Sequence, residues 1–252
     1  MPFVTALEVQ MLRGAQKLDV QRFTTTLNQV RQALQDIDRL AVTGRVARAR
    51  WVIDDVARHQ RVYTVRLTAG DSRTRDRESL LLPVGALVGG LQQLRQNSAL
   101  PEFYSETTVD RIVRMGTPGD GIESISLASV NGHVGPRESV DDIVIRHARQ
   151  AVRKDEVAIG SVTGFVHAIK KARVGVRATL FDPIRHRAVT CSAPSTMEGQ
   201  LRDAWPHRVI ARGRITRNAA GQPIRITLSN LELLPSDDAE RPPARSLLGG
   251  LC

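Results

Sequence analysis

The sequence predicts an α+β protein, in which an N-terminal mixed α/β domain precedes a five-stranded β-barrel of the OB type. Strand and helix patterns alternate over residues 1–138, whereas residues 156–236 hold five strand-like runs and one short helix. The order of these later elements, β-β-β-α-β-β, is that of an OB barrel. We expect residues 139–155 to form a connecting helix. Residues 237–252 are mostly polar with two prolines and predict a disordered tail.

Composition is typical of a globular protein outside membranes. Charged residues make up 25% and hydrophobic residues 41% of the 252 residues, as in ordinary soluble domains. The sequence has no run of 18 apolar residues, and its first residues lack the order of a secretory signal. We therefore expect a cytoplasmic protein. The two cysteines, Cys191 and Cys252, have no CxxC partner, so no zinc site is expected.

The net charge of +10 is concentrated in the predicted barrel. Residues 1–150 hold 20 basic and 17 acidic side chains, whereas residues 151–236 hold 14 basic and 6 acidic ones. All but four of the basic residues are arginine, a bias that a GC-rich genome would also produce. That bias does not explain where the charge lies. An excess of cations on one domain is typical of a protein that binds a polyanion.

Apolar spacing predicts the first elements of the N-terminal domain. Residues 3–12 alternate between apolar and polar and indicate a strand. Asp19 is placed to cap a helix, whose apolar residues recur at helical spacing over residues 20–40. Two further strand-like runs, residues 49–59 and 61–69, lie close enough together to form an antiparallel hairpin.

The remainder of this domain mixes loops, helices and a strand. Residues 70–79 are polar and predict a solvated loop, or else a phosphate contact through their arginines. A helix is expected over residues 83–97, with its proline in the first turn. Residues 105–116 predict a second helix with a Ser–Thr capping box, residues 121–130 a strand, and residues 138–154 a helix that leads into the barrel.

The barrel prediction depends on five strand-like runs, which cover residues 156–171, 174–182, 186–194, 207–218 and 223–235. Gly160 and Gly164 in the first run suit the bend that a long barrel strand needs. A helix is expected over residues 195–205, capped by Ser195. Its apolar residues, Met197, Leu201 and Trp205, are expected to plug one end of the barrel.

Three motifs lie within this region. The first comprises Gly160, Ser161, Val162, Gly164, Ala168 and Ile169. The second comprises Asp182, Pro183, Arg187, Val189 and Cys191, and the third comprises Val209, Gly213, Ile215, Arg217, Asn218, Gly221, Pro223, Ile224 and Ile226. With these motifs the region resembles a domain found in many uncharacterised bacterial proteins. The resemblance covers about a third of the chain, and it implies an OB-like fold but no reaction.

Catalytic and metal-binding patterns are scarce. The six histidines are scattered and form neither HxH nor HExxH. The acidic pairs Asp54-Asp55 and Asp141-Asp142 could hold a divalent metal, but such pairs more often lie at helix starts or strand ends. Residues 116–121 lack the order of a phosphate loop, and no GxSxG nucleophile motif is present. We expect no enzyme activity, no cofactor and no metal.

Strand alternation places several arginines on the outer face of the predicted barrel. The predicted nucleic-acid-binding residues are Arg177, Phe181, Arg208, Arg212, Arg214 and Arg225. Aromatic residues make up only 4% of the chain, so phosphate binding is favoured over stacking on bases. The prediction is a non-enzymatic nucleic-acid-binding or accessory factor, with single strands as the favoured ligand. Two alternatives remain: a protein-interaction module with an acidic partner, such as the antitoxin half of a two-protein system, and a merely solvated surface.

Overall fold

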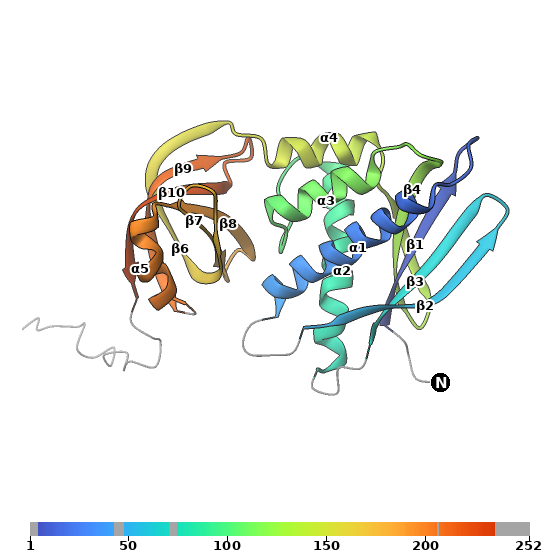
Figure 1. Ribbon diagram of the computed structural model, residues 1–252, viewed down its shortest axis with the longest axis horizontal. Helices are drawn as coiled ribbons and strands as arrows, with labels where there is room; N and C mark the ends of the chain where they lie inside the picture. Colours follow the sequence, from blue (N-terminus) through green and yellow to red (C-terminus); the bar gives the residue numbers. More distant parts are fainter. Residues whose placement is uncertain (1–4, 43–47, 71–74, 206, 235–252) are drawn as a thin grey trace, which may run out of the picture.

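The computed structural model describes residues 5–42, 48–70, 75–205 and 207–234 (Figure 1). Its N-terminal part contains β1 (Thr5–Arg13), α1 (Val20–Ala41), β2 (Arg50–His59), β3 (Val62–Gly70), α2 (Arg77–Gln96), α3 (Glu106–Gly116), β4 (Ile122–Asn131), β5 (Val134–Ser139) and α4 (Asp142–Ala151). Its C-terminal part contains β6 (Glu156–Lys171), β7 (Val176–Asp182), β8 (Arg187–Ala193), the 3-10 turn η1 (Ser195–Met197), α5 (Glu198–Asp203), β9 (Arg208–Arg217) and β10 (Pro223–Leu233). The fold is mixed α+β, as predicted, and it contains two five-stranded sheets. The predicted tail, residues 237–252, lies outside the described residues.

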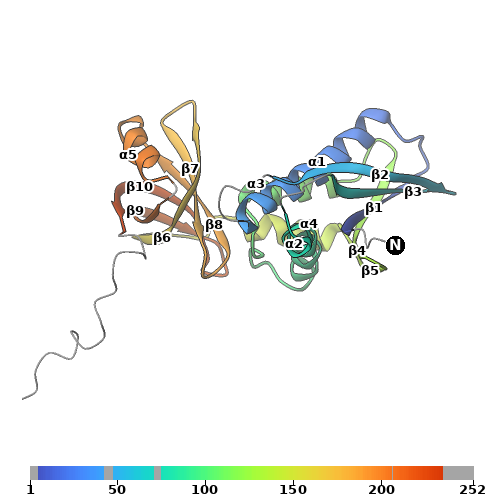
Figure 2. The same ribbon diagram turned by 90° about the horizontal axis from the view of Figure 1, so that it is seen from below.

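The N-terminal sheet is antiparallel, with the strand order β2-β3-β1-β4-β5. Helix α2 packs against β1 and β4, and α1 and α4 pack against α2 (Figure 2). Leu7 and Val9 of β1 are fully buried in the same core as Leu34 of α1 and Leu91 of α2. Among the described helices, none is long and apolar enough to cross a membrane.

Several N-terminal predictions are confirmed. Asp19 caps α1 by accepting a hydrogen bond from the backbone N–H of Arg22 at 2.9 Å. The hairpin of β2 and β3 turns at Gln60, which adopts a φ of 51°. Ser105 and Thr108 form the predicted capping box at the start of α3. Local side-chain chemistry is therefore sufficient to fix these boundaries.

Two predicted boundaries are wrong. Helix α2 begins at Arg77, capped by Asp76, so Pro83 lies inside the helix rather than in its first turn. In the second case, the helix expected over residues 138–154 is shorter, because a further strand, β5, pairs with β4 and α4 runs only from Asp142 to Ala151. Strand β5 lacks a clear apolar alternation, because its side chains lie at the edge of the sheet and are exposed or half-buried.

A buried ion pair explains the early start of α2. Arg75, placed by the prediction in a solvated loop, has a fully buried side chain that pairs with Asp38 of α1 at 2.6 Å. Pro83 has no N–H, so the carbonyl of Ser79 lacks its usual helical donor. The guanidinium of Arg75 donates to that carbonyl instead. Arg75 therefore both pairs with Asp38 and supplies the donor that Pro83 cannot provide.

The C-terminal strands form a closed ring in the order β10-β8-β7-β6-β9. All neighbours are antiparallel except β8 and β10, which are parallel. The interior is filled by apolar residues such as Val162, Leu180, Val209 and Ile226, and Leu201 of α5 is fully buried in the same cluster. Glycine is needed at position 164, because an added Cβ would lie 2.6 Å from the carbonyl oxygen of Phe181.

Two details of the predicted helix after β8 are wrong. Ser195 makes no side-chain capping bond, because the chain first forms the η1 turn and α5 begins only at Glu198. Trp205 does not plug the ring, since half of its surface is exposed. The short helix places only Leu201 and, in part, Met197 against the ring interior.

Replacing Asp38 with alanine should destabilise the N-terminal domain by about 3–5 kcal/mol, because Arg75 would remain buried without its counter-ion. Urea denaturation followed by the fluorescence of buried Trp51, in a Trp205→Phe background, measures this loss. Arg202→Ala is the matched control, since its pair with Glu198 is largely exposed and should contribute at most ~1 kcal/mol. Equal effects of the two variants would contradict the importance of the buried pair.

Candidate functional site

The structure does not bring the six predicted binding residues together. Arg177 and Arg225 line a cleft between the ring and helices α1 and α3. Arg212 and Arg214 are exposed on the outer face of β9, and Arg212 pairs there with Glu232 at 3.0 Å. Arg208 lines a separate cavity of the ring. The five predicted arginines are therefore divided among three places.

Phe181 is not a stacking platform, which corrects the prediction. Only 3% of its surface is exposed. It packs against Leu40 of α1, Ala188 of β8 and the ring of Phe103, whose centroid lies 6.1 Å away. Strand alternation correctly placed Phe181 on the outer face of the ring. That face is covered by the N-terminal domain. The alternation of residues along one β-strand does not indicate that another domain packs on the outer face.

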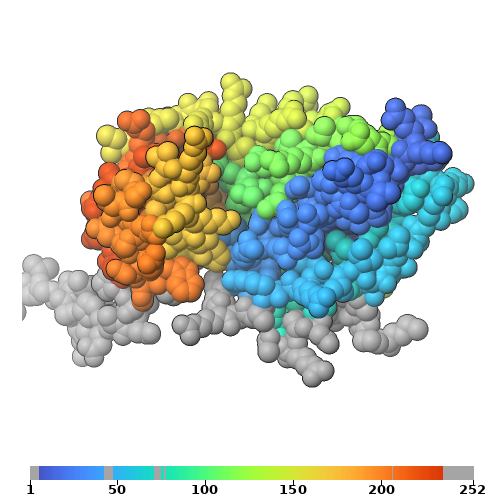
Figure 3. All heavy atoms as spheres, in the orientation of Figure 1, coloured from blue at the N-terminus to red at the C-terminus, as the bar shows by residue number. Residues whose placement is uncertain are grey.

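Backbone and aromatic contacts attach the β7–β8 loop to the N-terminal domain. The N–H of Phe103 donates to the carbonyl of His186 at 2.7 Å, and the two rings stack with centroids 4.7 Å apart. The carboxylate of Glu102 lies 3.3 Å from Nδ1 of His186. In the space-filling view, the golden residues of the ring lie directly against the green and blue helices (Figure 3).

Two buried amides attach the β9–β10 turn to the same domain. Asn218 donates to the carbonyl of Ala151, at the end of α4, at 2.8 Å. The side-chain Oε1 of Gln222 accepts from Nδ2 of Asn218 at 2.8 Å and from the backbone N–H of Leu100 at 2.6 Å. Both side chains are almost fully buried. Because buried amides need specific partners, these bonds hold the ring in one orientation.

A cleft of about 350 Å³ lies between the ring and helices α1 and α3. We name it the interdomain cleft. The outer faces of β6, β7, β8 and β10 form one wall, and α1 and α3 form the other. Its charged side chains are Asp36, Arg39, Glu106, Asp110, Arg111, Lys170, Arg177 and Arg225. The cleft therefore has five permanent cations and three carboxylates.

The ion pairs inside the cleft leave two of its five cations unpaired. Arg39 and Arg111 share Asp36, at 3.4 and 2.7 Å, and Arg225 pairs with Glu106 at 2.6 Å. Lys170 and Arg177 make no ion pair with any residue that the structure describes, and they are directly opposite each other on β6 and β7. Like charges in cross-strand register repel. An anion bound between them would relieve this repulsion.

His167 lines the same cleft and is neutral at pH 7. Burial lowers the pKa of its imidazole below the ordinary value, and the positive charges of Arg48 and Arg39 lower it further. A hydrogen bond with the backbone of Arg39 acts in the opposite direction. An added negative charge in the cleft would raise this pKa, because it would stabilise the imidazolium.

Signals for the helical wall of the cleft are weak in the sequence. Arg39 and Arg111 lie on helices whose polar faces are typical of solvated surface, and His167 is one of six scattered histidines. Lys170 is one of only four lysines in an arginine-rich chain. Only the assembled fold places these side chains within one cleft.

Other candidate centres do not show catalytic geometry. Asp141 caps α4 and pairs with Arg95 at 2.9 Å, so it acts structurally. Within the described ranges, no three His, Cys, Asp or Glu side chains lie close enough to hold a metal ion. Burial raises the pKa of the Cys191 thiol to about 12, which keeps it protonated and unreactive.

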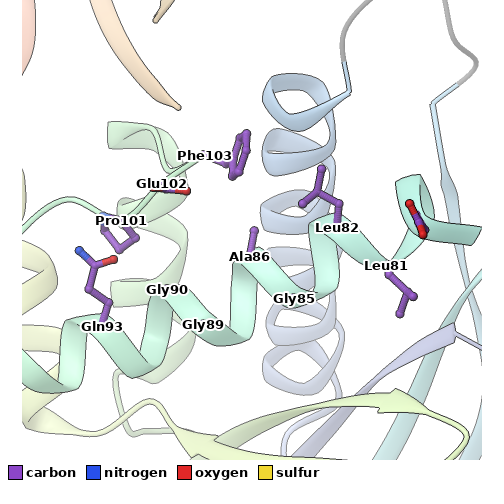
Figure 4. A pocket seen from close by; sticks show the side chains of 11 residues that line it. Leu81, Leu82, Gly85, Ala86, Gly89, Gly90, Gln93, Pro101, Glu102 and Phe103 are labelled. Carbon is purple, nitrogen blue, oxygen red and sulfur yellow. The ribbon is translucent and has the colours of Figure 1, made fainter. Parts of the chain in front are cut away.

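A third hollow runs along α2 and is mainly apolar. Figure 4 shows its wall, in which Gly85, Ala86 and Gly89 face the opening while Leu82 and Phe103 flank it. Its volume is about 500 Å³. It contains no cluster of titratable groups, which distinguishes it from the interdomain cleft.

No protein-family model matches the sequence, and no curated protein matches it.

Replacing Gln222 with alanine should weaken the docking of the ring on the helical domain. The buried N–H of Leu100 would lose its acceptor, which should make the docked state less stable by about 1–3 kcal/mol. We expect trypsin to cleave faster at Arg153 and Lys154, which lie between α4 and β6. Asn230→Ala, which removes an exposed amide from β10, is the control, and trypsin should cleave this variant at the parental rate. Unchanged cleavage of the Gln222 variant would contradict a docking role for this amide.

Proposed function

We propose that this protein is a non-enzymatic nucleic-acid-binding or accessory factor that holds a single strand by its phosphates in the interdomain cleft. The observation that carries this proposal is the pair of unpaired cations, Lys170 and Arg177, in cross-strand register on the cleft wall. Two adjacent uncompensated cations in a concave surface attract a polyanion.

We also infer that the ring is an OB-type barrel. Support comes from its strand connections, in which the third and fifth strands, β8 and β10, are the parallel pair, and from the helix between the third and fourth strands. OB barrels bind oligonucleotides over the face of their second and third strands. Here these are β7 and β8, whose outer side chains Arg177, Thr179 and Thr190 line the cleft.

The composition of the cleft favours backbone binding over base recognition. His167 is the one ring-bearing side chain among the described residues that line it, and Phe181 is buried. Sequence-tolerant binding of single strands normally combines cations with aromatic platforms. With cations alone, we expect modest affinity, little sequence preference and strong dependence on salt.

The double variant Lys170→Ala/Arg177→Ala should weaken binding of a fluorescent single-stranded oligonucleotide. Its plot of log affinity against log salt should be less steep by about 1.4, since each lost phosphate contact on a single strand contributes ~0.7. Fluorescence anisotropy across a salt series measures both quantities.

The matched control is Arg212→Ala/Arg214→Ala, which removes two exposed arginines of the outer face of β9. It should leave the salt slope of the parent unchanged. If the control and the cleft variant flatten the slope equally, binding depends on net charge and the cleft is not the site.

Oligonucleotide affinity should rise as the pH falls through the region below the ordinary histidine pKa of about 6.5. The folded pKa of His167 is depressed, and a bound phosphate would raise it, so binding takes up a proton. The stability of the free protein should fall over the same range, because the unfolded chain accepts that proton more readily. His167→Gln should remove the pH dependence of affinity, whereas His133→Gln, on an exposed turn, should retain it.

A protein-interaction module is the second candidate, favoured by the outer face of β6. Ile159 is 93% exposed and Val157 is 56% exposed, and Arg214 lies opposite Ile159 on β9. A mixed apolar and arginine surface suits a protein partner with acidic groups. Co-purification of one stoichiometric protein that survives nuclease treatment and is lost in Ile159→Asp would favour this candidate.

A further inference from the structure

The ring contains a second basic cavity, which shares no lining residue with the interdomain cleft. Its volume is about 390 Å³. Strand β6 pairs with β9 along Glu156–Phe165 but with β7 only from Phe165 onward, so one edge of its first half has no partner among the described strands. The β7–β8 loop and the β9–β10 turn contribute the remaining walls of the cavity. We name it the edge cavity.

The charge of the edge cavity is strongly positive. Its charged side chains are Asp182, Arg185, Arg187, Arg208 and Arg217. The carboxylate of Asp182 is already engaged, since it accepts from the backbone N–H groups of Ile184 and Arg185 and pairs with the guanidinium of Arg185 at 3.3 Å. Three arginines therefore remain without a carboxylate inside the cavity.

Arg187 and Arg208 are the two edge-cavity arginines whose side chains make no hydrogen bond or ion pair within the described part of the chain, and the Nε–H of each is buried without an acceptor. Arg217, which also lines the cavity, donates to the carbonyl of Gly221 at 2.9 Å. Buried Nε–H groups without an acceptor also occur at Arg13, Arg22 and Arg66, but those residues do not line this cavity. A buried donor without an acceptor is unfavourable. A ligand with several acceptor oxygens would satisfy both groups.

We propose that the edge cavity binds the phosphate group of a small phosphate ester between Arg187 and Arg208. A guanidinium presents two parallel N–H donors, which match two oxygens of a phosphate. A volume of about 390 Å³ is in the range of small-molecule sites. This inference does not rest on nucleic-acid binding in the interdomain cleft.

The motifs found in the sequence also converge on this cavity. Each of the three motifs contributes to its walls: Ser161 and Val162 from the first, Asp182, Pro183, Arg187 and Val189 from the second, and Arg217, Gly221 and Pro223 from the third. The interdomain cleft leaves these residues without a role. A shared ligand site would explain why residues far apart in the sequence meet here.

Isothermal titration of the full chain at constant ionic strength tests the proposal. The probes are inorganic phosphate, adenosine 5′-monophosphate, adenosine and acetate. We expect phosphate and the nucleotide to bind, and adenosine and acetate to show no binding. Arg187→Gln and Arg208→Gln should each weaken phosphate binding by about tenfold or more, since each removes one partner of a desolvated charge pair.

Three controls make the result decisive. Arg212→Gln removes an exposed arginine of the same ring and should leave phosphate affinity unchanged. Arg187→Lys and Arg208→Lys keep the charge but lose the paired N–H donors of the guanidinium. They test the site if the glutamine variants unfold, and we expect them to bind phosphate more weakly than the parent. Lys170→Ala/Arg177→Ala should bind phosphate normally while losing oligonucleotide affinity, which separates the two sites.

Any of three results would overturn the proposal. The first is parental phosphate affinity in folded Arg187 and Arg208 variants. The second is the absence of binding heat for both phosphate and the nucleotide. The third is acetate binding as tight as that of phosphate, which would indicate a general anion surface.

Discussion

The docking of the ring on the helices depends on a small set of buried amide hydrogen bonds. Asn218 and Gln222 lie in a turn of the ring, yet their partners are the backbone groups of Ala151 and Leu100 in the other domain. Interfaces between domains of one chain are commonly polar and permit relative motion. Here the amides are buried and paired, so sliding of the ring would leave several of their groups without partners. This geometry fixes the width of the interdomain cleft.

The same docking explains why the two basic cavities depend to different degrees on the interface between the domains. The interdomain cleft needs both domains, since α1 and α3 supply one wall and also supply the acids that neutralise Arg111 and Arg225. The edge cavity is formed by ring residues alone, but two of its segments, the β7–β8 loop and the β9–β10 turn, are held by the other domain. Loosening the interface would therefore disturb the cleft directly and the edge cavity only through that loop and that turn.

Much of the secondary structure could be predicted, because its signals are local. The five ring strands, the capped start of α1 and the capping box of α3 all depend on residues within a few positions of each other. The early start of α2 could not be predicted, because it depends on Arg75 reaching Asp38, which lies in another helix. Phe181 was misassigned for a similar reason: alternation reports which face a residue occupies, but not what covers that face. Arg177 and Arg225 were placed correctly on the outer face, whereas their neighbours in the cleft, Arg39 and Arg111, come from helices far away in the sequence.

The strand order of the N-terminal sheet has a consequence for synthesis of the chain. Strand β1 comes first in the sequence but lies between β3 and β4. On the ribosome it can pair with β3 early, but its other edge stays open until residues 122–131 have emerged. During that interval the apolar side chains of Leu7, Val9 and Met11 lack part of their final cover. The ring lies wholly within residues 156–233 and closes after that sheet is complete. The interval before residues 122–131 emerge is thus the one in which this sheet has an open edge on β1, a feature that favours pairing with other chains.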